Sequence, residues 1–323
     1  MKRLRPIKAN HFFIVLFLSG FILNIALTAD GSAKPLNIRF AFQDRIGSVL
    51  PIIAYEKGFF KDQGLEIKDL RFSSGPASAE ALYSGSADIA AMGDTTAIIM
   101  MTRSDKFTIM ASHATGEHRH RIMVGKDSAL KTLNDLKGRR VAVKKGTSTY
   151  GGLLAALTGS GISPGSIRLM DLTPPTMVDA LMAGSIDAFA ASEPTPSLAE
   201  QKGAVELTSL GGLGNQYPIM ILGNREWLDR KKTEMEKFVK AMKRAEDFIS
   251  QYPEETARIM SVQTGLSPAT AQKVIKSHRY GLRLDRPILD SLHQTARFLK
   301  EEKIIDRLPD FSTIVKMDFH DTQ

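Results

Sequence analysis

The stretch Ala81-Leu82-x-x-Gly85-Ser86-x-Asp88 occurs a second time in the chain, as Ala180-Leu181-x-x-Gly184-Ser185-x-Asp187. Every matched position is shifted by 99 residues (180 minus 81, 187 minus 88). In both copies the end of an apolar helix is followed by a Gly-Ser turn, an aspartate and a short apolar strand. An acidic residue follows this strand, Asp94 in the first copy and Glu193 in the second. Solenoid repeats have shorter periods than this. The pattern therefore predicts one helix-turn-strand unit that is used in two lobes.

The rest of the chain supports a two-lobed α/β fold. Short β-rich runs alternate with helical patterns from Leu36 to about Leu210, which is typical of βαβ units around a mostly parallel sheet. We interpret Arg121 to Val124 and Tyr217 to Gly223 as chain crossings, and the chain from Trp227 onward as a helical tail. We therefore predict that residues 34–119 and 225–323 form lobe 1, that residues 120–224 form lobe 2, and that a hinged cleft lies between them.

Composition indicates an exported globular protein. Hydrophobic residues make up 43% of the 323 residues, enough for a core in each of two domains. Four cations precede an uncharged apolar run at 12–29, and small residues follow, which is the order of a secretory signal peptide. Residues 1–33 are therefore predicted to be this signal, with cleavage after Ala29 or Ala33. An uncleaved membrane anchor is the alternative.

Charge and cysteine content exclude several function classes. The chain has no cysteine, so a disulfide, a thiolate metal site and a cysteine nucleophile are all ruled out. Without the four cations of the signal the net charge falls from +8 to about +4 (8 minus 4). The chain also lacks Lys/Arg runs interleaved with aromatic residues, so we predict no nucleic acid partner.

Three strand-to-helix junctions are candidate binding elements, at residues 73–76, 93–96 and 144–149. Ligands of open α/β sheets bind beyond the carboxyl ends of the strands, where helix N-termini offer backbone N–H groups and a positive dipole end. Glycines and hydroxyls at these junctions therefore predict a site for an anion or a polar ligand, with contacts from Asp94, Thr95, Thr147, Ser148 and Thr149. The last three could instead only cap a helix.

Several short segments, each of low specificity, together resemble the sequence of one protein family when they are taken in order. They are Tyr55 to Phe60, Asp135 to Val143, Pro174-Pro175 and Glu193-Pro194. In this order they resemble the solute-binding proteins of ABC importers for taurine, aliphatic sulfonates, nitrate and thiamine precursors, the NMT1/THI5-like family. The resemblance spans about residues 36–317.

The resemblance implies a periplasmic protein with the two-lobed Venus-flytrap fold of type II, which delivers a small molecule to a permease and needs no cofactor or metal. It also implies ligand contacts from loops that are matched here by Gln43, Ser74, Gly93, Asp94, Thr147, Ser148 and Glu193. One position departs from the family pattern. Many members carry Trp just before the Glu-Pro pair, where this chain has Ser192, and the substitution removes a stacking wall from the expected site.

Some acids and histidines have competing interpretations. Asp88 and Asp187 begin their strands, opposite to the end where sites form, so we interpret them as structural. Asp94 and Glu193 lie at the favourable end, although Glu193 could simply start a helix with Pro194. Two carboxylates there would repel a sulfonate or nitrate and would suit a ligand with an amine, such as taurine.

The histidine cluster is a weak metal candidate. His113, His118 and His120 with Glu117 match no standard ligand spacing, and two arginines nearby would oppose a cation. We therefore interpret this stretch as a solvated crossing segment.

No catalytic motif is present: the chain has no Gly-x-Ser-x-Gly elbow, no Walker loop and no His-Glu-x-x-His. We predict a monomeric binding protein that captures a small polar or anionic molecule and makes or breaks no bond. Two alternatives stay open. One is an enzyme of the pyrimidine-synthase type, although the cysteine cluster of those enzymes is missing, and the other is the ligand-sensing domain of a membrane-anchored receptor.

Overall fold

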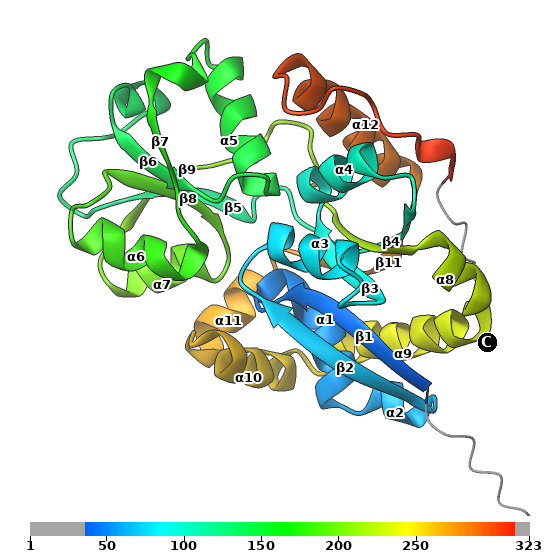
Figure 1. Ribbon diagram of the computed structural model, residues 1–323. Coiled ribbons are helices and arrows are strands. Elements are labelled where there is room, and N and C mark those ends of the chain that lie inside the picture. Colours follow the sequence, from blue (N-terminus) through cyan, green and yellow to red (C-terminus); the bar gives the residue numbers. More distant parts are fainter. Residues whose placement is uncertain (1–35, 314–323) are drawn as a thin grey trace, which may run out of the picture. The chain divides into compact units, whose positions relative to one another are not determined.

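The computed structural model describes residues 36–313, which contain two β-sheets. Sheet A has six strands in the order β11-β4-β10-β3-β1-β2, and sheet B has five in the order β7-β6-β8-β5-β9 (Figure 1). The strands of sheet A are β1 (Leu36–Gln43), β2 (Leu65–Phe72), β3 (Ile89–Gly93), β4 (Phe107–Thr115), β10 (Ile219–Asn224) and β11 (Arg279–Arg283). Those of sheet B are β5 (His120–Val124), β6 (Arg140–Val143), β7 (Arg168–Asp171), β8 (Ala188–Ser192) and β9 (Val205–Ser209).

The strand pairings show how each chain crossing enters its sheet. Strands β1 with β2 and β3, and β6 with β7 and β8, pair in parallel. The two strands predicted as crossings enter the other way: β10 lies antiparallel between β3 and β4, and β5 lies antiparallel between β8 and β9. Both sheets are therefore mixed, because each accepts one reversed strand from a chain crossing. In sheet A the edge strand β11 also pairs antiparallel with β4. The resulting order is the same in both, β2-β1-β3-β10-β4 and β7-β6-β8-β5-β9.

Helices cover both faces of each sheet. They are α1 (Val49–Glu56), α2 (Phe59–Asp62), α3 (Gly75–Tyr83), α4 (Asp94–Arg103), α5 (Ser148–Gly159), α6 (Pro174–Met182), α7 (Thr195–Gln201), α8 (Arg225–Arg230), α9 (Lys232–Gln251), α10 (Pro253–Thr264), α11 (Pro268–Ile275) and α12 (Arg286–Glu301). Alternate strand residues face opposite cores. In sheet B, Ile122 and Val124 pack with α5, whereas Met123 between them packs with α6 and α7. The buried strands are apolar on both faces for this reason.

The C-terminal helices pack against sheet A. Helix α9 places Met235, Phe238 and Met242 on one face, at the spacing of an amphipathic helix, and buries them against Phe40 and the residues of α1. Helix α12 packs on α4 on the opposite face of the sheet. The tail is helical as predicted except for β11, an edge strand that the sequence pattern did not reveal.

The repeated sequence stretch builds the same clamp in both sheets. Asp88 accepts hydrogen bonds from the backbone N–H of Arg39 at 2.8 Å and from its guanidinium at 2.7 Å. Asp187 binds Arg140 in the same way, at 2.7 and 2.8 Å. Each clamp ties the start of one strand, β3 or β8, to the neighbouring strand, β1 or β6, and both turns place a glycine in the left-handed region. The structural interpretation of Asp88 and Asp187 is confirmed.

The predicted signal peptide, residues 1–33, lies outside the described residues. Within residues 36–313 no helix combines the length and the apolar character needed to cross a membrane.

Candidate functional site

A cleft of about 600 Å³ opens at the carboxyl ends of strands from both sheets. Its volume lies in the range of small-molecule sites. Sheet A contributes residues that follow β1 and end β2, and sheet B contributes residues that follow β8 and begin α6 and α7. Its lining includes Asp44, Arg45, Arg71, Phe72, Pro174, Pro175, Val178, Asp179, Ser192, Glu193, Leu198 and Lys202. The cleft lies where α/β sheets bind ligands.

Two neighbouring arginines, of which Arg45 lines the cleft, have no carboxylate within ion-pair distance among the described residues. Arg45 lines the cleft and donates from Nη1 to the Ser192 hydroxyl at 3.1 Å, while its buried Nε has no partner. Arg119 is 1% exposed, and it donates from Nη2 to the Tyr217 carbonyl at 2.9 Å and leaves Nη1 without a partner. Such buried, unpaired guanidinium groups are costly unless an anion satisfies them.

Asp94 is the nearest compensating charge. It is fully buried at the start of α4 and accepts hydrogen bonds from Ser148 Oγ at 2.5 Å, Asn215 Nδ2 at 3.1 Å and Thr295 Oγ1 at 3.3 Å. Asp94 makes no direct ion pair with either arginine, but its charge favours their charged forms.

The two arginines remain cationic despite burial. Burial lowers the pKa of Arg119 to about 10, still far above neutral pH, and it also lowers the pKa of Arg45. Two cations face one anion here, so the protein alone leaves one excess positive charge.

Two buried histidines, His113 and His120, lie close enough to Arg45 and Arg119 for both charges to act on their rings. His113 is fully buried, and neither ring nitrogen has a partner. His120 is also fully buried, with Nδ1 at 2.7 Å from Thr149 Oγ1 and Nε2 without a partner. Burial lowers the pKa of His113 to about 3 and also that of His120, and the charges of Arg45 and Arg119 lower both further. Both rings are therefore neutral at pH 7.

These positions correct the interpretation of residues 113–121 as a solvated crossing. The segment enters the core between β4 and β5, and His113, Arg119 and His120 are almost inaccessible to solvent. Among the described residues, no three His, Cys, Asp or Glu side chains come together in a way that could hold a metal ion.

The buried histidines predict a loss of stability in acid. His113 and His278 have pKa values of about 3, and that of His120 is well below its usual range, whereas all three titrate near 6.5 in an unfolded chain. Between those values the unfolded chain binds more protons than the folded protein. The free energy of unfolding is therefore fully present above pH 6.5 and should fall below it, by up to about 1.4 kcal/mol per pH unit for each histidine.

Urea unfolding between pH 7.5 and 5 measures this slope. His113→Gln should flatten it by the share of one histidine, whereas His293→Gln, on the exposed face of α12, should leave it unchanged. An unchanged slope in the His113 variant would contradict the prediction.

The structure brings some of the predicted ligand residues together. Ser148 bonds Asp94, and its side chain packs so closely on Gly93 that a side chain at position 93 would collide with it. The Thr95 hydroxyl faces Gly151, where an added Cβ would lie 2.8 Å from it. Thr149 contacts His120. Gly93, Asp94 and Thr95 of sheet A therefore meet the start of α5.

Other predicted ligand residues are held by internal partners. Thr147 caps α5, because its hydroxyl accepts from Tyr150 N–H at 3.2 Å and donates to the Lys144 carbonyl at 2.7 Å. Gln43 donates to Ser78 and to the Ala91 carbonyl, which leaves its buried Oε1 without a partner. Ser74 is buried at the start of α3.

Glu193 lines the cleft and is paired across sheet B. Its Oε1 accepts from Arg121 Nη2 at 2.6 Å, and its Oε2 accepts from the Ser197 N–H at 3.3 Å. Neither Glu193 nor Asp94 is therefore free to receive the amine that the sequence pattern suggested.

Sequence reasoning missed Arg45, and it considered Arg119 only as a charge that opposes a metal. A signal for Arg45 did exist, since it stands two residues after the last residue of β1, at the end of the sheet where ligands bind. Nothing local marks Arg119, whose burial depends on the crossing segment entering the core.

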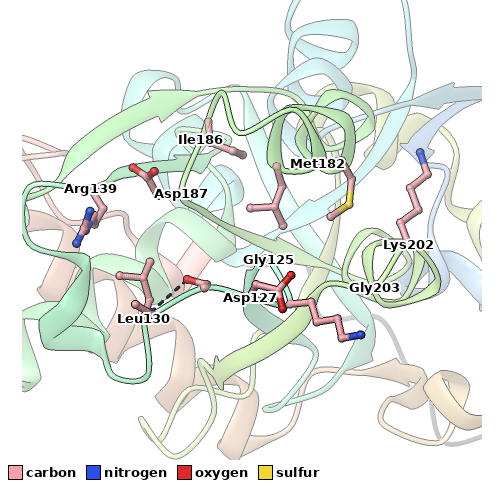
Figure 2. Close-up of a pocket in the computed structure, with 13 residues that line it drawn as sticks. Gly125, Asp127, Leu130, Arg139, Met182, Ile186, Asp187, Lys202 and Gly203 are labelled. Carbon is pink, nitrogen blue, oxygen red and sulfur yellow. Dashed lines mark hydrogen bonds between the residues drawn. The ribbon is translucent and has the colours of Figure 1, made fainter.

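A second hollow lies at the other end of sheet B. It has a volume of about 570 Å³, and its lining includes Arg139, Met182 and Asp187, which precede strands β6 and β8 (Figure 2). Asp187 already forms an ion pair with Arg140. Among the buried polar atoms without a partner, Arg45 Nε belongs to the lining of the cleft, and none belongs to a residue that lines this hollow.

Comparison with known proteins assigns the chain to a family. The model of the family described as "NMT1/THI5 like" matches residues 48–256. The chain belongs to the NMT1/THI5-like family. It is 27% identical over 298 residues to a protein of Bacillus subtilis (strain 168), provisionally named an aliphatic sulfonates-binding protein, with 90% of this chain and 89% of that protein covered. The taurine-binding periplasmic protein of Escherichia coli (strain K12) is 23% identical over 285 residues, which are 84% of this chain and 88% of that protein.

Solved structures show how widely the fold of this family member is used. The alkanesulfonate-binding protein SsuA from Xanthomonas axonopodis pv. citri, bound to MOPS, has a TM-score of 0.81 at 22% identity, over 88% of this chain and 99% of that chain. The desulfurization enzyme DSZB has a TM-score of 0.69 at 14% identity, over 86% and 95%. The predicted family and the two-lobed periplasmic-binding-protein fold are confirmed. Like its relatives in the family, the protein is a solute-binding protein.

Proposed function

We propose that the protein captures a small organic monoanion, a sulfonate, outside the cytoplasmic membrane and delivers it to the permease of an ABC importer. The observation that carries the ligand class is the pair of arginines without a carboxylate partner, half-buried Arg45 and buried Arg119. Asp94 is the carboxylate whose charge favours the charged forms of both arginines, so one negative charge on the ligand would balance the site. Names of relatives that bind sulfonates and taurine point to the same chemistry.

The unpaired polar atoms also suit a sulfonate head. Besides Thr256 on α10, five side chains of the described residues have a buried group without a partner that can donate a hydrogen bond: Arg45, Ser48, His113, Arg119 and His120. Of these, Arg45 lines the cleft. A sulfonate carries three oxygens that only accept, so it can satisfy several donors at once, and bonds between charged groups are the stronger kind. A cationic ligand would find no comparable set of acceptors among these atoms.

Contacts between elements of the two sheets support closure around the ligand. Arg45 reaches Ser192, Asp94 reaches Ser148, and Thr96 donates to the Gly146 carbonyl at 2.7 Å. We propose that residues 36–119 and 225–313 move as one lobe and residues 120–224 as the other, and that ligand binding stabilises their closed arrangement. The permease then recognises that closed arrangement. The protein acts as a monomer from which the signal peptide has been removed. It has no nucleic acid partner.

Two other roles are less well supported. The DSZB likeness demonstrates that an enzyme can use this fold, and fold alone never decides function. Binding without a chemical step is favoured because the site combines unpaired donors with neutral, enclosed histidines and no cysteine exists in the chain. A membrane-anchored sensor would need an uncleaved N-terminal segment, and the mass of the exported protein distinguishes it.

Calorimetric titration of the purified protein tests the proposal. We expect an alkanesulfonate to bind with a dissociation constant near micromolar, which needs about 8 kcal/mol, and an alkylammonium of the same length not to bind. Mass spectrometry should recover the sulfonate unchanged after prolonged incubation. Failure of every organic sulfonate to bind would refute the proposed ligand class, and conversion of the ligand would refute the absence of chemistry.

A further inference from the structure

We propose that a groove between α3 and α4 is a second binding site, for a dicarboxylate with an apolar middle, and that its occupation favours the closed arrangement of the two lobes. The groove has a volume of about 500 Å³, which lies in the range of small-molecule sites. It shares no lining residue with the cleft at Arg45. The second site is therefore separate from the one at which we place the sulfonate.

The walls of the groove are matching faces of two adjacent helices (Figure 1). Helix α3 contributes Pro76, Ala79, Glu80 and Tyr83, and helix α4 contributes Thr96, Ile99, Met100 and Arg103. Both sets have the spacing i, i+3, i+4, i+7, which places their members on one side of a helix. The sets are offset by 20 positions (96 minus 76, 103 minus 83), and a Cβ added to Gly75 would lie 2.9 Å from Thr96 Oγ1. Because β2 and β3, which precede the helices, are both parallel to β1, the two faces run side by side in the same direction.

Most of the surface between the helices is apolar. Met100 belongs to a buried cluster of sheet A, and Ala79 and Ile99 pack against it. Tyr83 places its ring on Phe107, with the ring centroids 5.9 Å apart, and yet remains 58% exposed. Seven residues of helix span about 10 Å, so an apolar chain of about this length can lie along the groove and lose surface to water.

A cation stands toward each end of the groove. Lys145 belongs to the loop between β6 and α5, which reaches the start of α3, since a Cβ added to Gly146 would lie 3.6 Å from Pro76 Cγ. Arg103 ends α4, at the position that matches Tyr83 of α3. Within residues 36–313 neither cation has a carboxylate at ion-pair distance. Two cations with an apolar surface between them complement a molecule that carries a carboxylate at each end.

Glu80 is the acid in this lining, and it lies midway along the α3 side. It is exposed, so solvent and salt screen its repulsion of an anion. Glu80→Gln should therefore tighten dicarboxylate binding by roughly twofold, the size expected for an exposed charge.

The groove also joins the two proposed lobes. Helices α3 and α4 belong to the first, Lys145 and Gly146 belong to the second, and Thr96 donates to the Gly146 carbonyl at 2.7 Å. A ligand that contacts both lobes stabilises their closed arrangement, and by linkage it should strengthen sulfonate binding. This coupling rests on the proposed function, whereas the binding of a dicarboxylate does not.

Calorimetric titration of the purified protein with suberate, succinate and octanoate tests the site. Suberate, the eight-carbon dicarboxylate, is of about the length of the groove when it is extended. Succinate has four fewer methylenes and should bind at least about tenfold more weakly, because each buried methylene is worth on the order of fourfold. Octanoate has a methyl group in place of one carboxylate and should bind about threefold more weakly than suberate.

Variants locate the ligand. Lys145→Gln and Arg103→Gln should each remove the preference for suberate over octanoate. Lys144→Gln is the matched control and should keep that preference, because Lys144 pairs with Asp171 at 3.1 Å and does not line the groove. Ile99→Ala should reduce the preference for suberate over succinate several-fold. Each ratio is measured on one variant, so a loss of stability does not obscure it.

A titration of ethanesulfonate in saturating suberate measures the coupling, and we expect the sulfonate to bind at least about fivefold more tightly there. Equal affinity for suberate and succinate, or a preference for suberate over octanoate that survives both cation variants, would overturn the second site. An unchanged affinity for ethanesulfonate would overturn the coupling. Suberate binding without binding of any sulfonate would overturn the proposed function and leave the second site standing.

Discussion

Replacement of Arg45 by glutamine should weaken the binding of an alkanesulfonate by roughly 30-fold to a few thousand-fold. Truncating one member of a buried, hydrogen-bonded charge pair costs about 2–5 kcal/mol, and each 1.4 kcal/mol is a factor of ten in the dissociation constant. Arg45 is the charged residue of the cleft whose guanidinium has no carboxylate partner and whose Nε has no hydrogen bond. Its charge is therefore available to a ligand, and its removal takes away the attraction for the anion.

The stability of the same variant gives a second signature. A buried guanidinium without an ion-pair partner destabilises the unliganded protein, so Arg45→Gln should have an unchanged or higher melting temperature without ligand. Arg71→Gln is the matched control, because Arg71 lines the same cleft but is engaged by Asp44, Asp69 and Glu56. We expect it to change sulfonate affinity by less than about tenfold. Equal losses of affinity in both variants would contradict a specific role for Arg45.

Replacement of Asp94 by alanine should lower the free energy of unfolding by about 3–5 kcal/mol. Removing one member of a buried charged network leaves the opposite charge uncompensated. Asp94 is fully buried, and its carboxylate favours the charged forms of Arg45 and Arg119. The change would also strand the hydroxyl of Ser148 and the amide of Asn215, which both donate to it.

Urea denaturation of the unliganded protein at pH 7.5 measures the loss. Asp179→Ala serves as the control, because Asp179 forms an ion pair with Lys202 at the surface, with side chains 75% and 55% exposed. Exposed pairs contribute about 0–1 kcal/mol, so the control should be close to the parent protein. If Asp94→Ala were no less stable than the control, Asp94 would not be the counter-charge of the two arginines.

Much of the fold was predictable because its signals are local. The repeated turn with Gly85 and Gly184 requires left-handed backbone, and the aspartate that follows clamps the neighbouring strand in both sheets. Apolar periodicity then separates strands from helices. The antiparallel entry of β5 and β10 was not predictable in this way, because strand direction within a sheet depends on where the chain crosses and not on any residue of the strand.

The candidate site was predictable only as a location. The rule that ligands bind beyond the carboxyl ends of strands led to Gly93, Asp94 and Ser148, which the structure does bring together. It did not reveal that Thr147 caps the N-terminus of α5. Nor did it reveal that Glu193 forms an ion pair with Arg121, which precedes it by 72 residues in the sequence (193 minus 121).

By itself, the sequence determined the duplicated unit, the alternation of strands and helices, the helical tail and the end of the sheets at which the candidate site lies. The tertiary structure decided which charges are left unpaired there. Whether Arg45 or Arg71 is compensated depends on carboxylates brought near by the fold, and whether His113 is neutral depends on its burial beside two cations. Ion pairing and desolvation of charged groups depend on how atoms are arranged in space, so a local sequence pattern carries no signal for them. They nevertheless set the sign of the charge that the cleft can accept.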